Sequence, residues 1–309
     1  MSLPTTVGST FAGTAAGFYI SAALKQSTSL EFTTLLENIK YKQVIQRLEA
    51  GSVITDAGCD FATAGTLALT EQVIEPKNLQ VNLEICKANL LSSWESLQMR
   101  AGAGAPPPPS FEDYLIAHLG EIIAQGVETS IWSGTGVAAS GTFTGFLGAG
   151  TGLLLAANAP LVIQQASQGG AGTIFDADNI VQNFQLGTAA IPATIYTKED
   201  LYIYVSPKTY RLYIQAVSAS GFVNQYSMND DYTPVFEGIK IAVCQGMLDN
   251  HLVIATKENL YFGTDLLSDT TRIDLLDMAQ LDGSDNMRMV ARYSAGVQYG
   301  IESEIVVVS

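Results

Sequence analysis

The clearest pattern of apolar and polar positions in the chain is a strict alternation that starts at Leu79. Leu79, Val81, Leu83 and Ile85 alternate with Gln80, Asn82, Glu84 and Cys86. Successive side chains of a β-strand point to opposite faces of the sheet. The period of two therefore predicts a strand with one covered face and one more polar face.

Two segments ahead of this strand, residues 40–48 and 66–74, also favour extended structure. Residues 49–65, between them, are rich in the Gly, Ala, Asp and Thr that are typical of loops. We therefore predict a long two-stranded β-excursion from about Lys40 to Lys87. A two-stranded ribbon is marginally stable by itself in water, so it needs a surface to lie on, for instance a neighbouring subunit.

The strongest helical pattern spans residues 111–133. Ser110 is placed to cap its N-terminus, and Glu112 and Asp113 lie in the first turn, where the helix dipole favours negative charge. Gly134 ends the helix. At 1.5 Å per residue it would be about 35 Å long. Its apolar stripe is Phe111, Leu115, Ile116, Leu119, Ile122, Ile123, Val127 and Ile131, and its polar face is Tyr114, His118, Glu121, Gln125 and Glu128.

The second half of the chain mixes short strands with helices, which predicts an α+β fold. One helix begins near Asp176, and another begins at Ser206 as N-cap with Pro207 at its first position and continues through Val217. Near the N-terminus, residues 30–39 have a helix-like spacing that does not separate helix from strand. The expected strands are residues 201–205, 239–243, 252–255, 260–262, 272–278, 288–299 and 302–308.

Low-complexity stretches flank these elements. Residues 1–28 are rich in Gly, Ser, Thr and Ala, and we expect a flexible arm there. Residues 101–109 form a stiff, polyproline-like connector into the long helix. The longest apolar stretch, residues 152–163, contains Asn158 and Pro160 and is too short to cross a bilayer, so we expect no membrane partner.

Charge narrows the classes of function. Only 15% of the 309 residues are charged, whereas 47% are hydrophobic, which indicates a chain that covers part of its surface with partners. The net charge is −15, and Lys and Arg form no cluster. Tight binding to nucleic acid depends on such cations, so sequence-specific DNA binding is disfavoured. A protein shell that encloses DNA without binding it tightly remains compatible with this charge.

No constellation of residues predicts catalysis, a cofactor or a metal site. Cys59, Cys86 and Cys244 are scattered, and His118 and His251 are far apart in the sequence. A β-turn explains Asp282, Asp285 and Asn286 better than a cation site does, and the same holds for residues 229–231. We expect Trp94 and Trp132 to be packing anchors and Cys86 to be a small buried side chain.

Several stretches resemble the major capsid proteins of tailed bacteriophages that have the HK97 fold. They are NIKYK (38–42), LALTEQVIEPKNLQVNLEICK (67–87), SFEDYLIAHLGEIIAQGVETSIWSGTG (110–136), ENLYFGTDLLSD (258–269) and RMVARYSAGVQYGIESEIVVV (288–308). The resemblance implies an N-terminal arm at 1–37, an E-loop β-hairpin at 38–88 and a P-domain at 89–157 and 263–309. It also implies a spine helix at 110–133 within the P-domain and an A-domain at 158–262.

The resemblance further implies a function. The chain would assemble through pentamers and hexamers into the icosahedral head that encloses double-stranded DNA. Its partners would be further copies of itself, a scaffolding protein, a portal and decoration proteins, and it would be part of the virion after assembly in the cytoplasm of a host bacterium. An encapsulin-like nanocompartment shell is the alternative. An enzyme and a secreted β-rich adhesin are further readings, which the missing catalytic motifs and the long helix disfavour.

Two departures from the family limit what the resemblance carries over. The chain has no long, charged, helical N-terminal segment, so we expect scaffolding to be a separate protein or already removed. Nothing marks Lys77 or Lys87 for a covalent cross-link to asparagine.

Assembly leads to two expectations about single segments. Residues 1–28 and 49–65 would become ordered only on assembly. The apolar phase of the alternating strand, at Leu79, Val81 and Leu83, would contact a neighbouring subunit, so Val81→Asp would impair assembly more than folding.

Overall fold

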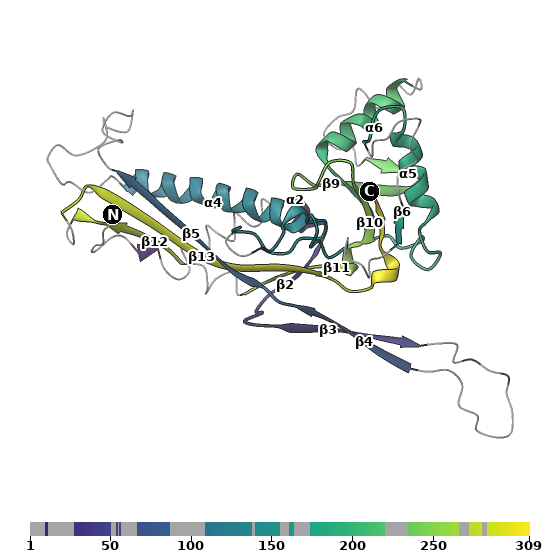
Figure 1. The fold of residues 1–309 in the computed structure, drawn as a ribbon, viewed down its shortest axis with the longest axis horizontal. Helices are drawn as coiled ribbons and strands as arrows, with labels where there is room; N and C mark the ends of the chain where they lie inside the picture. Colours follow the sequence, from purple (N-terminus) through teal and green to yellow (C-terminus); the bar gives the residue numbers. More distant parts are fainter. Residues whose placement is uncertain are drawn as a thin grey trace.

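The computed structural model describes residues 10–11, 28–50, 54, 56, 67–86, 109–137, 140–154, 161–163, 174–219, 234–265, 272–279 and 283–309. The chain forms an elongated body with two β-sheets, one long helix and a projecting two-stranded ribbon (Figure 1). This arrangement confirms the predicted α+β class.

The first sheet is organised around its longest strand, β13 (Asn286–Tyr299). Strand β5 (Lys77–Cys86) pairs antiparallel with β13 over all ten of its residues. Strands β12 (Arg272–Asp277) and β11 (Leu260–Thr264) also pair with β13, in succession along its length. The short strands β1 (Thr10–Phe11) and β2 (Thr34–Leu36) extend β12 and β11.

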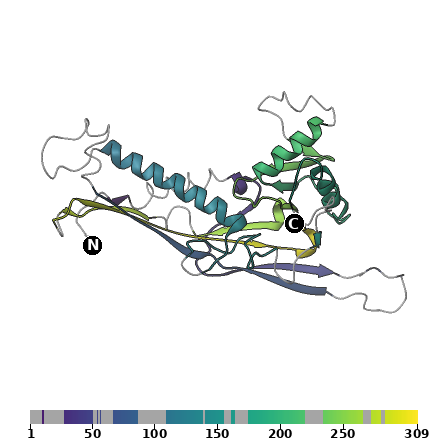
Figure 2. The same cartoon turned by 45° about the horizontal axis from the view of Figure 1, so that its top comes forward.

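The second sheet has the order β6-β14-β10-β7-β9-β8. Its strands are β6 (Leu161–Ile163), β14 (Val306–Val308), β10 (Leu252–Thr256), β7 (Leu201–Val205), β9 (Ile239–Val243) and β8 (Val235–Phe236). Helices α5 (Ile180–Ala189) and α6 (Pro207–Ala219) pack beside it (Figures 1 and 2). Every residue of β10 is buried, which identifies it as a central strand.

The strands of the second sheet connect two hydrophobic cores. Tyr204 and Val253 point into the core that also contains helix α4 (Pro109–Ser133). Their neighbours Ile203 and Ile254 point into the other core, beneath α5 and α6. Because successive side chains of a strand point to opposite faces, alternate residues of β7 and β10 enter opposite cores. The second sheet thus separates the two cores.

Helix α4 confirms the predicted long helix, although its surroundings differ from the prediction. Leu119, Ile123 and Val127 are buried as expected, but Ile122 is 45% exposed. Glu128, which the helical pattern places on the polar face, is only 5% exposed. The last turns of α4 are enclosed on more than one side, so burial there does not follow the apolar stripe alone.

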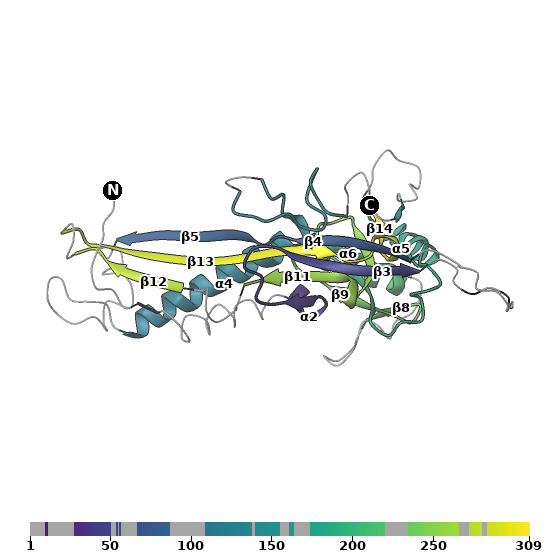
Figure 3. The same ribbon diagram turned by 90° about the horizontal axis from the view of Figure 1, so that it is seen from below.

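The ribbon consists of strands β3 (Gln43–Ala50) and β4 (Leu67–Ile74), with Gln43 opposite Ile74 and Ala50 opposite Leu67. It is shorter than the predicted excursion to Lys87, because β5 pairs with β13 in the body. Figure 3 shows β5 and β13 side by side along the body, with the ribbon continuing beyond them.

The expected contact of Leu79 and Val81 with a neighbouring subunit is therefore wrong, whereas Leu83 is 39% exposed and its expected contact stays a prediction. Leu79 is buried in the core that contains α4, and Val81 packs against the same core from within the chain. The alternation correctly predicted one covered face, but it carried no information about what covers it.

Other segments differ from the prediction in smaller ways. Within residues 30–39, helix α2 (Thr28–Glu31) is followed by strand β2. At the C-terminus, a 3₁₀ turn, η4 (Glu302–Glu304), precedes a strand of only three residues, β14. Strands β4, β7, β9, β10, β11 and β12 and helix α6 confirm their predictions. The expected arm at 1–28 and most of the loop at 49–65 lie outside the described residues.

Among the helices that the structure describes, none combines the length and the apolar character needed to span a bilayer.

Shortening a buried side chain of β5 should destabilise the isolated subunit. Leu79→Ala should lower the free energy of unfolding by about 2–5 kcal/mol, because it removes buried apolar contacts and leaves a cavity. Leu83→Ala, in the same phase of the same strand but exposed, should cost less than about 1 kcal/mol. Urea denaturation measures both, and equal losses would contradict the assignment of β5 to the core.

Candidate assembly surfaces

The ribbon has one face open to solvent and one face turned toward its own chain. Val44 and Val73 face each other across the ribbon and are 46% and 43% exposed, and Leu69 on the same face is 56% exposed. On the opposite face Ile74 is completely buried and Ile45 is partly buried. The open face thus presents apolar side chains that the described part of the chain covers only in part.

Polar contacts on the open face hold the two strands in register. Between the valine pair and Leu69, the side-chain amide of Gln46 donates a 2.9 Å hydrogen bond to the Glu71 carboxylate. The ribbon also projects away from the first sheet as a separate pair of strands (Figures 1 and 2). A projecting two-stranded ribbon with exposed β-branched side chains can bury apolar area against a second protein surface.

The second candidate surface element is the segment of residues 28–36, called here the N-terminal strap. Its anchor is the buried carboxylate of Glu128 on α4. This carboxylate accepts hydrogen bonds from the Ser29 N–H at 3.1 Å, the Ser29 hydroxyl at 2.5 Å and the Thr28 hydroxyl at 3.2 Å. The Gly246 N–H, in the loop between β9 and β10, donates a further bond at 3.2 Å. One carboxylate therefore joins the strap, the helix and the second sheet.

Two neighbours complete this carboxylate anchor. The Trp132 indole N–H donates a 2.6 Å hydrogen bond to the Ser29 hydroxyl oxygen, while that hydroxyl donates to Glu128. The backbone at Gly246 lies so close to α4 that only glycine fits, since a Cβ at this position would overlap the backbone carbonyl oxygen of Glu128. Trp132 is fully buried, which confirms the predicted packing anchor.

The rest of the strap crosses from the second sheet to the first. The Tyr204 hydroxyl donates a 2.7 Å hydrogen bond to the Phe32 carbonyl, and the Thr34 hydroxyl donates one of 3.0 Å to the Lys257 carbonyl. Strand β2 then pairs in parallel with β11. The strap thus bridges both sheets as well as the spine of the body, α4.

The surroundings of the anchor are strongly desolvating. Burial raises the pKa of the Cys244 thiol far above its ordinary range, and burial likewise raises the pKa of the Tyr204 phenol. Both groups therefore stay neutral in the folded chain at physiological pH, and neither has the thiolate or phenolate character that a reactive group needs.

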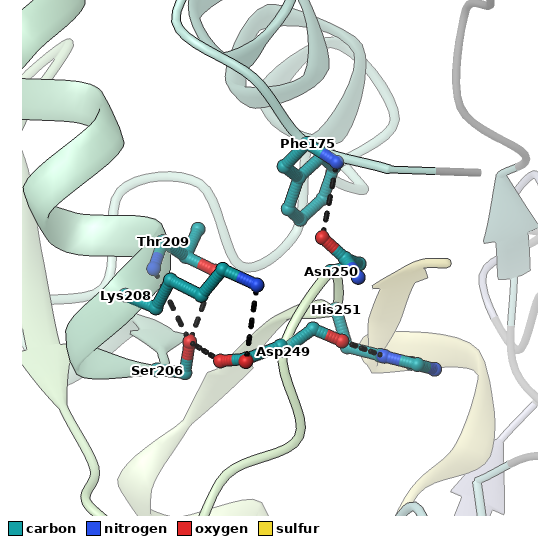
Figure 4. A network of polar contacts seen from close by, with 7 residues as sticks. All are labelled: Phe175, Ser206, Lys208, Thr209, Asp249, Asn250 and His251. Carbon is teal, nitrogen blue, oxygen red and sulfur yellow. Dashed lines mark hydrogen bonds and ion pairs between the residues drawn. The ribbon is translucent and has the colours of Figure 1, made fainter. Parts of the chain in front are cut away.

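Ser206, Asp249 and His251 lie close together but do not form a catalytic arrangement (Figure 4). The Ser206 hydroxyl donates a 2.9 Å hydrogen bond to the Asp249 carboxylate and accepts one of 3.2 Å from the Thr209 N–H, which caps α6 as predicted. Lys208 lies 3.3 Å from the same carboxylate. The His251 ring nitrogen Nδ1 lies 2.8 Å from the Asp249 backbone carbonyl. Nδ1 of the imidazole thus contacts main chain and not the Ser206–Asp249 pair, and the contacts of Asp249 hold the β9–β10 loop to α6.

The remaining candidates from the sequence do not converge. In the described part of the chain, no three His, Cys, Asp or Glu side chains gather as a metal ion would require. Asn286 donates a 2.8 Å hydrogen bond to Glu84, and Cys86 is a partly buried free thiol. The side chain of His118 lies outside the described residues, as do Cys59, Lys87, Trp94, Asp282 and residues 229–231.

Comparison with solved structures identifies the fold. The capsid of an empty GTA particle matches with a TM-score of 0.58 and 12% identity, covering 91% of this chain and 89% of that chain. The capsid of the cyanophage P-SCSP1u matches with 0.58 and 11%, covering 100% and 91%. The chain has the HK97-like capsid fold. A virus-like particle from Pyrococcus furiosus also matches, with 0.53 and 9%, covering 94% and 96%.

Sequence comparison adds nothing to this assignment: no family model and no curated protein matches the chain. With identities of 9–12%, the likeness concerns the fold. Two parts of this chain are therefore candidate assembly surfaces. One is the open face of the ribbon, whose apolar side chains are partly exposed, and the other is the N-terminal strap, which polar contacts join to α4 and to the second sheet.

Removing the charge of the Glu128 anchor should loosen the strap. Glu128→Gln should lower the free energy of unfolding by about 2–3 kcal/mol, because an amide places a donor against other donors in a buried site. Glu121→Gln, on the exposed side of the same helix, should change it by less than about 0.5 kcal/mol. Denaturant titration compares the variants, and a loss in the Glu121 variant as large as in the Glu128 variant would contradict the anchor.

Alkaline pH should destabilise the chain. In the unfolded chain a thiol ionises near about pH 8.5 and a phenol near about pH 10, whereas Cys244 and Tyr204 stay protonated in the fold. The unfolded state then binds fewer protons, so the free energy of unfolding falls as pH rises above about 8.5. Cys244→Ala should remove up to about 1.4 kcal/mol per pH unit from this slope. Urea unfolding between neutral and alkaline pH measures it, and an unchanged slope in the variant would refute the thiol's contribution.

Proposed function

We propose that this chain is a major capsid protein, whose copies assemble through pentamers and hexamers into the icosahedral head of a tailed bacteriophage. The single observation that carries the proposal is a projecting ribbon with an open apolar face on an HK97-like fold. Such a face has a favourable environment only against another surface. In a closed shell, every subunit offers this surface to the next one.

The parts of the subunit follow from this proposal. Residues 1–37 serve as the N-terminal arm, residues 38–76 as the E-loop and α4 as the spine helix. We propose this shorter range for the E-loop in place of the predicted 38–88, because β5 pairs with β13 in the first sheet. The P-domain otherwise keeps residues 89–157 and 263–309, and the A-domain residues 158–262. Two strands cross these limits, because β14 pairs with β10 in the second sheet and β11 begins at Leu260 in the first.

The contents and partners form the second part of the proposal. With a net charge of −15 and no cluster of Lys or Arg in the sequence, the shell encloses double-stranded DNA without binding its sequence. A scaffolding protein, a portal and decoration proteins complete the head, which assembles in the cytoplasm of the host bacterium. The chain acts as a structural protein and not as an enzyme.

The second candidate is a protein compartment related to encapsulins. A virus-like particle from Pyrococcus furiosus shares the fold, but its TM-score of 0.53 is below the 0.58 of the GTA capsid, so the comparison supports this candidate less than the phage head. The two candidates predict different contents for the assembled shell: DNA in a phage head and protein cargo in a compartment.

Electron microscopy of the purified chain, together with its mass in solution, tests the proposal. Closed shells, or rings of five and six subunits, would support it, and nuclease-protected DNA in shells made with the neighbouring phage genes would favour the head. Shells that hold only protein would favour the compartment. A chain that stays monomeric even when those genes are co-expressed would overturn both.

A charge on the open face of the ribbon should block assembly and leave folding intact. Val44→Asp should abolish shells or capsomers, since it places a carboxylate in an apolar contact, while its unfolding free energy changes by less than about 1 kcal/mol. Gln43→Asp adds the same charge to an exposed position on the other face and serves as control. Sedimentation and electron microscopy measure how much of each variant assembles. Shells of normal yield from Val44→Asp would exclude this face as an interface.

A further inference from the structure

Lys77 occupies the point where the chain passes from the ribbon to the body. It is the first residue of β5, and only Glu75 and Pro76 separate it from the last residue of β4. Its ammonium nitrogen lies within hydrogen-bonding distance of three backbone carbonyl oxygens. These are Gly136 at 3.1 Å, Val137 at 3.2 Å and Thr142 at 2.9 Å.

The three carbonyls belong to the loop at 134–144, which follows α4 and of which the structure describes residues 134–137 and 140–144. An isolated antiparallel bridge between Thr135 and Thr144 closes this loop, and Gly136 turns it with a φ of +65°. An ammonium group has three donors and no acceptor, so three converging carbonyls satisfy all of its hydrogens. Each of these hydrogen bonds is charge-assisted and therefore stronger than one between neutral groups.

This loop is a firm support, because its base continues the hydrogen bonding of the helix end. The Gly145 N–H donates to the Gly134 carbonyl at 2.8 Å, and the Phe146 N–H donates to the Ile131 carbonyl at 2.8 Å. Phe143, next to the carbonyl of Thr142, is buried edge-on against Phe262 of β11. A side chain bound to the loop is thus bound to α4 and to the first sheet.

Packing alone does not determine the direction of the ribbon at this point. Ile74 anchors the root in the apolar region around Gly263, but such a contact is non-directional. Beside it, a hollow of about 360 Å³ separates the root from the loop, lined by Val73, Pro76, Lys77, Phe143, Thr144, Leu153 and neighbouring residues of β13. On this side, directional contacts come from Lys77 and from the 2.9 Å hydrogen bond of the Gln298 amide to the Val73 carbonyl.

We propose that Lys77 is a positioning residue that sets the direction in which the ribbon leaves the body, by holding its root to the three carbonyls of the loop at 134–144. The importance of this direction for assembly rests on the proposed function. The positioning itself is a property of the single subunit and is tested there.

Lys77→Met and Lys42→Met form a matched pair of variants. Lys42 lies at the same root, but its ammonium group pairs with the exposed carboxylate of Glu75, at 2.8 Å, and lies over the ring of Tyr41, so it does not bind the loop. Fluorophores on noncanonical residues at the exposed Ile54, beyond the end of β3, and at the exposed Gln215 of α6 leave the native cysteines and the Gln46–Glu71 hydrogen bond in place. Single-molecule energy transfer in the full chain then reports the direction of the ribbon at concentrations where subunits are separate.

The distribution of transfer efficiency should broaden about twofold in Lys77→Met and stay as in the wild type in Lys42→Met. Hydrogen exchange in the loop at 134–144 should become about tenfold faster in Lys77→Met, with exchange in β10 unchanged. Lys77→Arg keeps the charge, but its planar fork does not match three converging carbonyls, so its distribution should be intermediate.

A distribution in Lys77→Met and Lys77→Arg as narrow as in Lys42→Met would overturn the proposal. So would faster exchange in β10 to the same degree as in the loop, because it would indicate general destabilisation. If the wild type forms shells and the distribution of transfer efficiency in Lys77→Met is unchanged, the positioning role is rejected and the capsid function is kept. A broadened distribution of transfer efficiency in Lys77→Met, in a chain that never assembles, would support the positioning role and reject the capsid function.

Discussion

The body of this subunit depends on one buried carboxylate. A charged group taken out of water is costly unless hydrogen-bond donors surround it, and Glu128 on α4 finds its donors on two other segments. The donors on the strap, and the one in the loop after β9, must therefore reach the end of α4 at the same time. Because the carboxylate has no favourable alternative inside the protein, the arrangement of helix, strap and second sheet is selected as a unit.

The long shape follows from this unit and from the length of β13. A strand of 14 residues can pair with β5 over one part and with β11 over another, so the first sheet extends far beyond the anchor. Helix α4 covers it from the anchor end, and the ribbon leaves near the junction of β11 and β13 (Figure 3). The ribbon itself has few partners within the chain, and three of its apolar side chains, Val44, Leu69 and Val73, stay exposed.

The periodicity of apolar residues predicted most of the helices and strands, because it shows which side chains must be buried. The helix ending at Ser133 and the strands β7, β9, β10 and β11 follow from apolar patterns of period 3.6 or two. The pairing of β5 with β13 was not predictable in this way, because a strand with one covered face fits a ribbon and a sheet equally well. The burial of Glu128 was also missed, since its cause is a strap about 100 residues earlier in the chain.

Local sequence gives still less information about the directional contacts. Nothing in the neighbouring sequence distinguishes Lys77 from other lysines at the start of a strand. Its three hydrogen-bond acceptors lie in a loop about 60 residues later in the chain. Ser206 differs, because serine before proline is a helix start that depends on neighbouring residues alone, and it was predicted correctly. Contacts within a few residues can be inferred from the sequence, whereas contacts that depend on the pairing of distant strands require the fold.

The charge of the chain determines what kind of contact can hold the proposed shell together. Each subunit carries a net charge of −15, so neighbouring copies repel one another over distances of about 8 Å at physiological ionic strength. Ion pairs between exposed side chains contribute little against this repulsion. Burial of apolar area does not depend on charge, and the open face of the ribbon supplies such area. A ribbon held in one direction brings that area to the neighbour already oriented, so less conformational freedom is lost when the contact forms.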